Sequence, residues 1–221
     1  AAEALNYMAL AGYDTETSIA MLPNVLNLAA AGGLELATAS DMVTDAQSAL
    51  NLSLKQTETL IDQMAMASSK TNTSVGQLGE AILEVGGNAR NLAGGTAELN
   101  TMLGVLADNG IKGAEGGTHL RNLILALSAP TDQAAKKMKA LGIQAFDANG
   151  KMRSLPEVFT KMSAAMGSLT DQEKTQALSE IFNTTDLAAA NYLLGTSTER
   201  YNELADAMSN AEGSADLMAK T

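Results

Sequence analysis

The stretch "NGIKGAEGGTHLRNLILAL", residues 109–127, decides the fold class of this chain. It holds four glycines and the only histidine of the 221-residue sequence, directly ahead of an apolar run. The apolar residues of that run recur at the spacing of one helix face: Leu120, Leu123, Ile124 and Leu127. The stretch therefore predicts the start of an amphipathic helix, unless its glycines bind a phosphate or its histidine is catalytic.

Similar apolar stripes recur along the whole chain and predict helices that pack on one another. We expect them near residues 2–11, 15–31 with an interruption at Pro23, 40–51, 56–69, 74–86, 96–108, 114–128, 131–141, 155–166, 170–182, 185–194 and 197–210. Capping-box pairs mark several starts: Ser74 with Gln77, Ser154 with Glu157, Thr170 with Glu173, and Thr196 with Glu199. The sequence predicts an all-α fold, a multi-helix globular array of about ten to twelve short helices.

One segment departs from this helical pattern. From residue 142 the chain reads "GIQAFDANGKMRSLPE", in which Asn149 and Gly150 stand between two short extended pieces. An Asn-Gly pair in that setting is the strongest local signal for a hairpin. We expect a small two-stranded β-hairpin inserted near residues 143–153, resting on neighbouring helices through Phe146 and Met152 because isolated hairpins are marginal in water.

The composition shifts near Pro130, which predicts two helical portions. The N-terminal portion is residues 1–129, and the C-terminal portion, residues 130–221, holds the hairpin; one continuous domain is the alternative. The chain opens without Met and without the pattern of a signal peptide, which favours a piece cut from a longer protein. Its apolar runs fall short of the roughly 20 residues of a membrane span.

Composition excludes several classes of function. Aromatic residues make up 3% of the chain and twelve residues are Met, so the core must be built from aliphatic side chains. The absence of Cys excludes disulfides, thiolate metal sites and a cysteine nucleophile, and one His excludes a two-histidine metal site. A net charge of −11 argues against direct nucleic-acid binding and against docking on anionic lipid. The lysines at 136, 137 and 139 are expected on a solvated helix face.

The glycine-rich stretch does not fit a phosphate-binding loop or a catalytic histidine. A Walker loop ends in Gly-Lys-Ser/Thr, but Thr118 and His119 follow the last glycines here and Lys112 lies ahead of them. A catalytic histidine needs a nucleophile and an orienting carboxylate, and Thr118 would point elsewhere on a helix. A structural histidine on a helix is the favoured interpretation of His119.

Metal binding and carboxylate chemistry are also weakly supported. The turn at Asp147 resembles the start of a calcium loop, with Asn149 at the third position, but Lys151 and Met152 occupy the fifth and sixth, and Glu157 falls one residue early. A plain hairpin turn fits better. Among twenty-five acidic residues some pair will have the spacing of two catalytic carboxylates by chance, so such a spacing alone does not indicate a glycosidase site. We predict no catalytic, cofactor-binding or metal-binding residues, and no cofactor.

Six long stretches resemble, in chain order, the core region of phage tail tape measure proteins. They are "AAEALNYMALAGYDT", "LPNVLNLAAAGGLELATASDMVTDAQSALNL", "SVGQLGEAILEVG", "LADNGIKGAEGGTHLRNLILAL", "LGIQAFDANGKMRSLPEVFTKM" and "KTQALSEIFNTTDLAAANYLL". The resemblance runs from residue 1 to about residue 215. Tyr13 stands where the family pattern has Trp, and Ser154 where it has Pro.

The resemblance implies a helical structural protein of a tailed bacteriophage or prophage, made in the bacterial host cytoplasm and located in the virion tail. Such proteins lie in the lumen of the tail tube, and their length sets tail length. The implied partners are the tail tube protein, tail assembly chaperones, tail tip or baseplate proteins, and further copies of the chain itself. The family offers no enzymatic residues in this core to carry over.

Two alternatives from other classes stay open at this level. One is a helical adaptor or chaperone-like module that binds partner helices without catalysis. The other is an enzyme, such as a cell-wall-cleaving domain. Whatever the class, a single helix of 221 residues would span roughly 330 Å, and Pro23, Pro130 and the glycine joints exclude such a rod. We expect a folded module with a radius of gyration near ~17 Å.

Overall fold

The computed structural model describes residues 2–221, and within them the chain forms thirteen α-helices, one 3-10 helix and no β-strand. The α-helices are α1 (Ala2–Leu10), α2 (Thr15–Gly32), α3 (Leu36–Leu50), α4 (Leu54–Lys70), α5 (Val75–Val85), α6 (Gly95–Asp108), α7 (Gly113–Ser128), α8 (Asp132–Ala140), α9 (Leu155–Ala165), α10 (Asp171–Phe182), α11 (Leu187–Gly195), α12 (Thr198–Ser209) and α13 (Ser214–Ala219). The 3-10 helix η1 is Gly86–Asn91. The predicted all-α class is confirmed.

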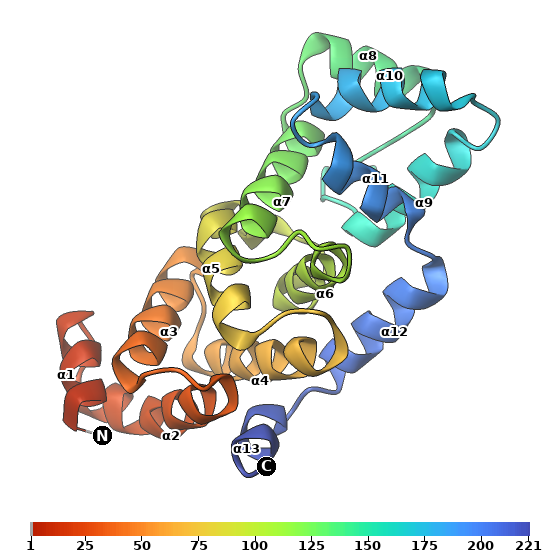
Figure 1. Ribbon diagram of the computed structural model, residues 1–221. Coiled ribbons are helices and arrows are strands. Elements are labelled where there is room, and N and C mark those ends of the chain that lie inside the picture. The colour runs from red at the N-terminus through yellow and green to blue at the C-terminus, as the bar shows by residue number, and fades with distance from the viewer. Residues whose placement is uncertain (1) are drawn as a thin grey trace.

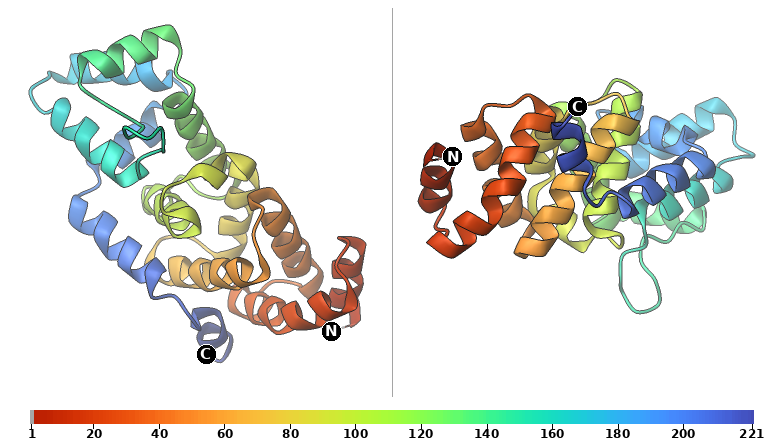
Figure 2. Two further views of the ribbon diagram at one scale, coloured as in Figure 1. Left: turned by 180° about the vertical axis from the view of Figure 1, so that it is seen from behind. Right: turned by 90° about the horizontal axis from the view of Figure 1, so that it is seen from below.

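The helices build an elongated body (Figures 1 and 2). Helices α1, α2 and α3 form one end, and α8 and α10 lie side by side at the other. Between them α5 and α7 pack along each other, with α9 and α11 beside the α8–α10 pair. Helix α12 then runs back along α4 and α6, and α13 packs on α2 and α4. The last two helices of the chain, α12 and α13, therefore pack against helices of its first half.

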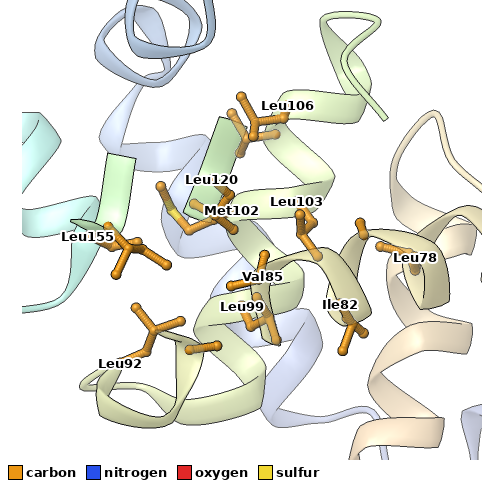
Figure 3. Close-up of a cluster of buried hydrophobic side chains, with 14 of the residues drawn as sticks. Leu78, Ile82, Val85, Leu92, Leu99, Met102, Leu103, Leu106, Leu120 and Leu155 are labelled. Atoms are coloured by element: carbon orange, nitrogen blue, oxygen red, sulfur yellow. The ribbon is translucent and has the colours of Figure 1, made fainter. Parts of the chain in front are cut away.

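Helix α6 is the centre of the core (Figure 3). Every residue from Glu98 to Ala107 is buried, so this helix is enclosed on all sides rather than on one face. It contacts α4, α5, α7, α9, α11 and α12. Its leucines meet Leu120 of α7 and Leu155 at the start of α9 (Figure 3). Helices on both sides of residue 130 thus share one set of buried side chains.

This shared core predicts cooperative unfolding. Truncation after residue 129 would remove α9, α11 and α12 from α6, and the free energy of burial is roughly 25 cal/mol per Å² of apolar surface. We expect the full chain to unfold in one transition and the fragment 1–129 to lack a stable fold. Circular dichroism and calorimetry of both chains check this: coincident transitions with equal calorimetric and van't Hoff enthalpies are expected for the full chain. Two separate transitions would contradict the expectation.

Several helix boundaries differ from the predicted ones for local reasons. Helix α2 continues through Pro23 without a break, since this proline is exposed and its missing N–H leaves only one carbonyl without an intrahelical partner. The predicted cap at Thr196 is wrong by one residue: Ser197 Oγ accepts from Arg200 N at 3.2 Å, and the Thr196 hydroxyl donates to Tyr192 O at 2.8 Å. The short helices η1 and α13 were not predicted, because six residues are too few to show a period.

The predicted β-hairpin near residues 143–153 is wrong. The segment holds one isolated antiparallel bridge, between Phe146 and Met152, and no strand. Its turn does close, because Asp147 N donates to Lys151 O at 2.8 Å. No ladder extends from it, because the residues before Phe146 are drawn into the helical core: Ile143 and Ala145 are both buried. An isolated hairpin is marginally stable, so packing against the helices decides the backbone path of this segment.

No single helix within residues 2–221 is long and apolar enough to cross a membrane. Helices α2 and α3 pass that test only when taken together, and they are bent by 117° relative to each other.

Candidate functional site

The glycines of the 109–127 stretch lie where α7 meets α5. Helix α7 begins at Gly113, which has a left-handed φ of 64° that favours glycine. A Cβ on Gly117 would lie 2.7 Å from Glu84 Cβ and 2.8 Å from the carbonyl carbon of Ala81 on α5. The Lys112 ammonium donates to Asn72 O at 3.2 Å and does not face the glycines. The geometry is that of two helices in close contact and offers no cradle for a phosphate.

His119 is bound to a buried carboxylate. Its Nδ1 lies 2.6 Å from Asp186 Oδ1, within hydrogen-bond distance. Asn122 and Asn183 donate to Asp186, at 3.2 and 2.8 Å. Asp186 is fully buried and lies directly before α11, where its side chain makes no cap hydrogen bond. The cluster therefore joins α7 to the C-terminal helices.

The His119 cluster lacks the parts of a catalytic triad. Its Nε2 lies 3.9 Å from a Glu115 carboxylate oxygen, and the one hydrogen bond of the imidazole within residues 2–221 goes to Asp186. The neighbouring Thr118 hydroxyl lies 3.5 Å from Glu84 Oε2, on the side of α5. A triad needs a nucleophile within hydrogen-bond reach of the imidazole. The arrangement of these groups orients helices, and it supports a structural histidine.

Glu98 is a second buried acid, and nothing in its sequence context marks it. One carboxylate oxygen accepts from Gly94 N at 2.7 Å, and the other accepts from Leu155 N at 2.6 Å. Both groups lie at helix starts, where backbone N–H groups lack intrahelical acceptors. Burial raises the pKa of Glu98 above its usual 4.5, against the opposing effect of the two hydrogen bonds. The side chain ties the start of α9 to α6.

Replacing Glu98 by Gln tests this contact. The amide offers one oxygen for two N–H donors, of which that of Leu155 is buried, so we expect a loss of about 1–3 kcal/mol in the free energy of unfolding. The raised pKa means that the folded state binds a proton more tightly than the unfolded state. The stability contributed by Glu98 therefore falls as pH rises from 4.5 through the raised pKa. Urea unfolding of both proteins across this range should show the gap between wild type and E98Q narrowing as pH rises; a widening gap would contradict the assignment.

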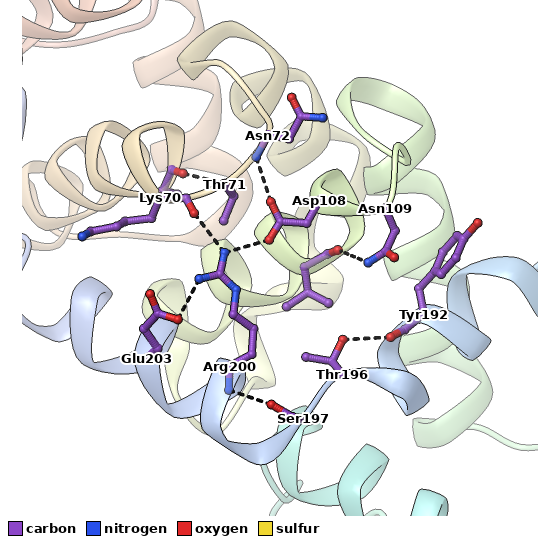
Figure 4. Close-up of polar contacts among 12 residues, drawn as sticks. Lys70, Thr71, Asn72, Asp108, Asn109, Tyr192, Thr196, Ser197, Arg200 and Glu203 are labelled. Carbon is purple, nitrogen blue, oxygen red and sulfur yellow. Dashed lines mark hydrogen bonds and ion pairs between the residues drawn. The ribbon is translucent and has the colours of Figure 1, made fainter.

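The Arg200 side chain on α12 forms hydrogen bonds with the C-terminal ends of α4 and α6 (Figure 4). Its Nη2 donates to Lys70 O at 2.9 Å and to Asp108 Oδ2 at 2.8 Å, and its Nη1 donates to Glu203 at 2.9 Å. Lys70 and Asp108 end α4 and α6, where a cation is favoured by the helix dipole. The hydrogen bond to Asp108 raises the pKa of Arg200 above its usual value. This contact also holds helices in place.

The turn at Asp147 binds its own backbone. Asp147 Oδ1 accepts from Asn149 N at 2.8 Å and from Lys151 N at 3.0 Å. These bonds lower the pKa of the carboxyl group below its usual value. The carboxylate is thus used to shape the turn. Among residues 2–221 no group of three His, Cys, Asp or Glu side chains lies close enough to hold a metal ion.

Comparison with known proteins agrees with the resemblance found in the sequence. The family described as phage-related minor tail protein matches residues 1–183. The "Tape measure protein" of Pneumococcus phage Dp-1 is 30% identical over 221 residues, which is 100% of this chain and 19% of that protein. The "Probable tape measure protein" of Escherichia phage P2 is 27% identical over 216 residues, or 96% of this chain and 26% of that protein. A shorter match, 38% identical over 78 residues, covers 35% of this chain and 26% of "Coatomer subunit epsilon" of Caenorhabditis elegans.

No solved structure matches the chain. The chain spans about a fifth to a quarter of the length of the two phage proteins. The family match covers α1 to α10, and the helices beyond it fold back onto that part. The chain belongs to the phage-related minor tail protein family.

Proposed function

We propose that this chain is a folded module of a tape measure protein, which acts in tail assembly and determines tail length inside the tail tube. The observation that carries the proposal is the similarity to two tape measure proteins over nearly the whole chain. The packing supports it, since the polar contacts at His119, Glu98 and Arg200 all join helices. The module is structural and non-catalytic.

Its partners in this proposal are the tail tube protein, tail assembly chaperones, tail tip or baseplate proteins and other copies of the chain. The protein is made in the host cytoplasm and is incorporated into the virion tail. The tube subunits assemble around the tape measure until it is covered, so the length of the tape measure in its tail conformation limits the number of tube rings.

Deleting residues 1–221 in frame from the encoding phage tests the proposal. A segment of this length would span roughly 330 Å as one straight helix, and a compact module spans much less. We expect shorter tails by electron microscopy, with a loss well below that figure if the module stays folded in the tail. A tandem duplication of the segment is the matched control and should lengthen tails by the same amount. Normal assembly at unchanged tail length in both mutants would contradict the proposal.

A further inference from the structure

A hollow of about 400 Å³ lies between the end of α3, the first half of α4, η1 and the start of α6. Its volume is within the range of ~300–1,000 Å³ that is usual for small-ligand pockets. Leu50, Leu52 and Leu99 form an apolar wall, and the other described residues that line the hollow are small or polar. Among them Arg90 is the one that carries charge, in a chain with 25 acidic residues. A lining with a cation and no acid favours an anionic ligand over a cationic one.

Gln63 on α4 contributes a buried amide to this lining. The residue is 4% exposed, and within residues 2–221 its Oε1 has no hydrogen-bond donor. A buried acceptor without a donor carries the full desolvation penalty of that group, so such acceptors are rare in folded proteins. The terminal torsion of a glutamine side chain is broad and roughly two-fold, so the oxygen can turn toward the hollow. The amide is therefore placed to accept a hydrogen bond from an N–H group of a bound molecule.

The start of α6 presents backbone donors to the same hollow. The N-cap residue is Gly94, and no side chain forms a cap hydrogen bond there. A capping side chain normally accepts from the N–H group of the second or third helical residue, which are Thr96 and Ala97 in α6. Both residues line the hollow. Their N–H groups are open to an anion, and the helix dipole favours negative charge at this position.

Arg90 adds a cation with a fixed position. Its Nε donates to Ala49 O at 2.8 Å and its Nη2 donates to Ser48 O at 3.1 Å, which holds the exposed guanidinium at the end of α3. Both acceptors are backbone carbonyls, and neither bond uses Nη1. A carboxylate is a strong acceptor for a guanidinium N–H group. Arg90 and the start of α6 therefore favour the same kind of ligand group.

The buried acid Glu98 limits the charge of that ligand. Its carboxylate accepts from Gly94 N and from Leu155 N, so it faces the start of α9, and it does not line the hollow. Its negative charge still offsets part of the helix dipole of α6. The hollow is therefore suited to a ligand group with one negative charge, such as a carboxylate, more than to a phosphate.

We infer that this hollow, here called the Gln63 site, binds a carboxylate flanked by an amide N–H group and an apolar side chain. This is the chemistry of the C-terminal residue of a peptide chain, and a free N-acylated amino acid shares it. The carboxylate accepts from the N–H groups of Thr96 and Ala97 beside Arg90. The amide N–H group donates to Gln63 Oε1, and the apolar side chain contacts the leucine wall. The inference goes beyond the proposed function and does not depend on tail assembly.

Titration of the 221-residue chain with N-acetyl-leucine, followed by two-dimensional NMR, tests the inference. We expect saturable shifts of the backbone amide signals of residues 94–97 and of the Gln63 side-chain amide. N-acetyl-leucinamide lacks the charge and should bind roughly tenfold more weakly or worse, the size expected for losing a hydrogen bond to a charged group. Inorganic phosphate should also bind more weakly than N-acetyl-leucine, because it carries more charge beside Glu98.

A short peptide that ends in leucine distinguishes the two sources of the ligand. Tighter binding of this peptide than of N-acetyl-leucine would support the C-terminus of a protein chain as the ligand. Equal affinities would support a small N-acylated acid, because one residue then supplies all the contacts.

Gln63→Leu separates ligand binding from folding. The substitution removes the unsatisfied buried oxygen, so Q63L should be at least as stable as wild type in urea unfolding, while its affinity for N-acetyl-leucine should fall roughly tenfold. Arg90→Gln should weaken binding to a similar degree. Gln133→Leu is the matched control: Gln133 is exposed on α8 and does not line the hollow, so binding should be unchanged.

Four results would overturn the inference. They are the absence of saturable shifts at residues 94–97, equal binding of N-acetyl-leucine and its amide, tighter binding of phosphate than of N-acetyl-leucine, and unchanged affinity in Q63L. A destabilised Q63L would also contradict it, because the Gln63 amide would then serve the fold and not a ligand.

Discussion

Gly117→Ala should destabilise the protein by about 3 kcal/mol or more, at the upper end of the cost of overpacking a core. A methyl group at this position meets the backbone of Ala81 and the Cβ of Glu84, and neither can move without shifting α5 as a whole. Alanine is favoured over glycine inside a helix by about 1 kcal/mol, so the clash must outweigh that gain. Thermal or urea unfolding measures the net effect, and a stabilised G117A would show that α5 and α7 do not approach this closely.

Gly79→Ala is the control for this prediction. A Cβ on Gly79 also meets a close neighbour, but the neighbour is the Met42 side chain from Cγ to Cε and not the backbone. The thioether can rotate away, and the gain in helix propensity of about 1 kcal/mol offsets part of the cost. We expect G79A to unfold within about 1 kcal/mol of wild type. Similar losses for G79A and G117A would mean that the rigidity of the contacted atoms does not decide the outcome.

Asp186→Ala should lower the free energy of unfolding by about 2–3 kcal/mol, because three hydrogen bonds to one buried acceptor are lost at once. The substitution removes the acceptor shared by His119, Asn122 and Asn183, whose own side chains are partly or fully exposed to solvent. Far-ultraviolet circular dichroism during urea unfolding measures the loss.

Glu115→Ala provides the comparison at the same histidine. The Glu115 carboxylate lies 3.9 Å from His119 Nε2, and its side chain is 67% exposed. Exposed ion pairs contribute about 0–1 kcal/mol, so E115A should change stability little. Equal losses for D186A and E115A would show that burial of the Asp186 contact is not what stabilises the link between α7 and the C-terminal helices.

The sequence predicted the helices because their signals are local. An apolar stripe of four residues specifies α7, and a hydroxyl at the cap marks the start of α10, each without reference to the rest of the chain. Thr170 and Glu173 form the predicted capping box in full, with both reciprocal bonds present. Such features depend only on helical geometry and on the hydrogen-bonding needs of the first turn.

The contacts between helices could not be predicted in the same way. His119 and Asp186 are 67 residues apart, and Glu98 and Leu155 are 57 residues apart. Neither acid differs in its local context from the many acids on solvated faces. The one available hint was the run Asn183-Thr-Thr-Asp186, in which the Asn183 side chain accepts from two following backbone N–H groups. The hairpin prediction failed for the opposite reason: a strong local turn signal was outweighed by burial of its flanking residues in the helical core.

The central claim is that these helices pack on one another into a folded module and do not form an extended rod. Small-angle X-ray scattering of the 221-residue chain tests it most directly. The account predicts a radius of gyration of about 17–20 Å, as for a folded chain of this length with a somewhat elongated shape. A rod-like profile with a radius several times larger, approaching the roughly 95 Å of one straight helix, would contradict it.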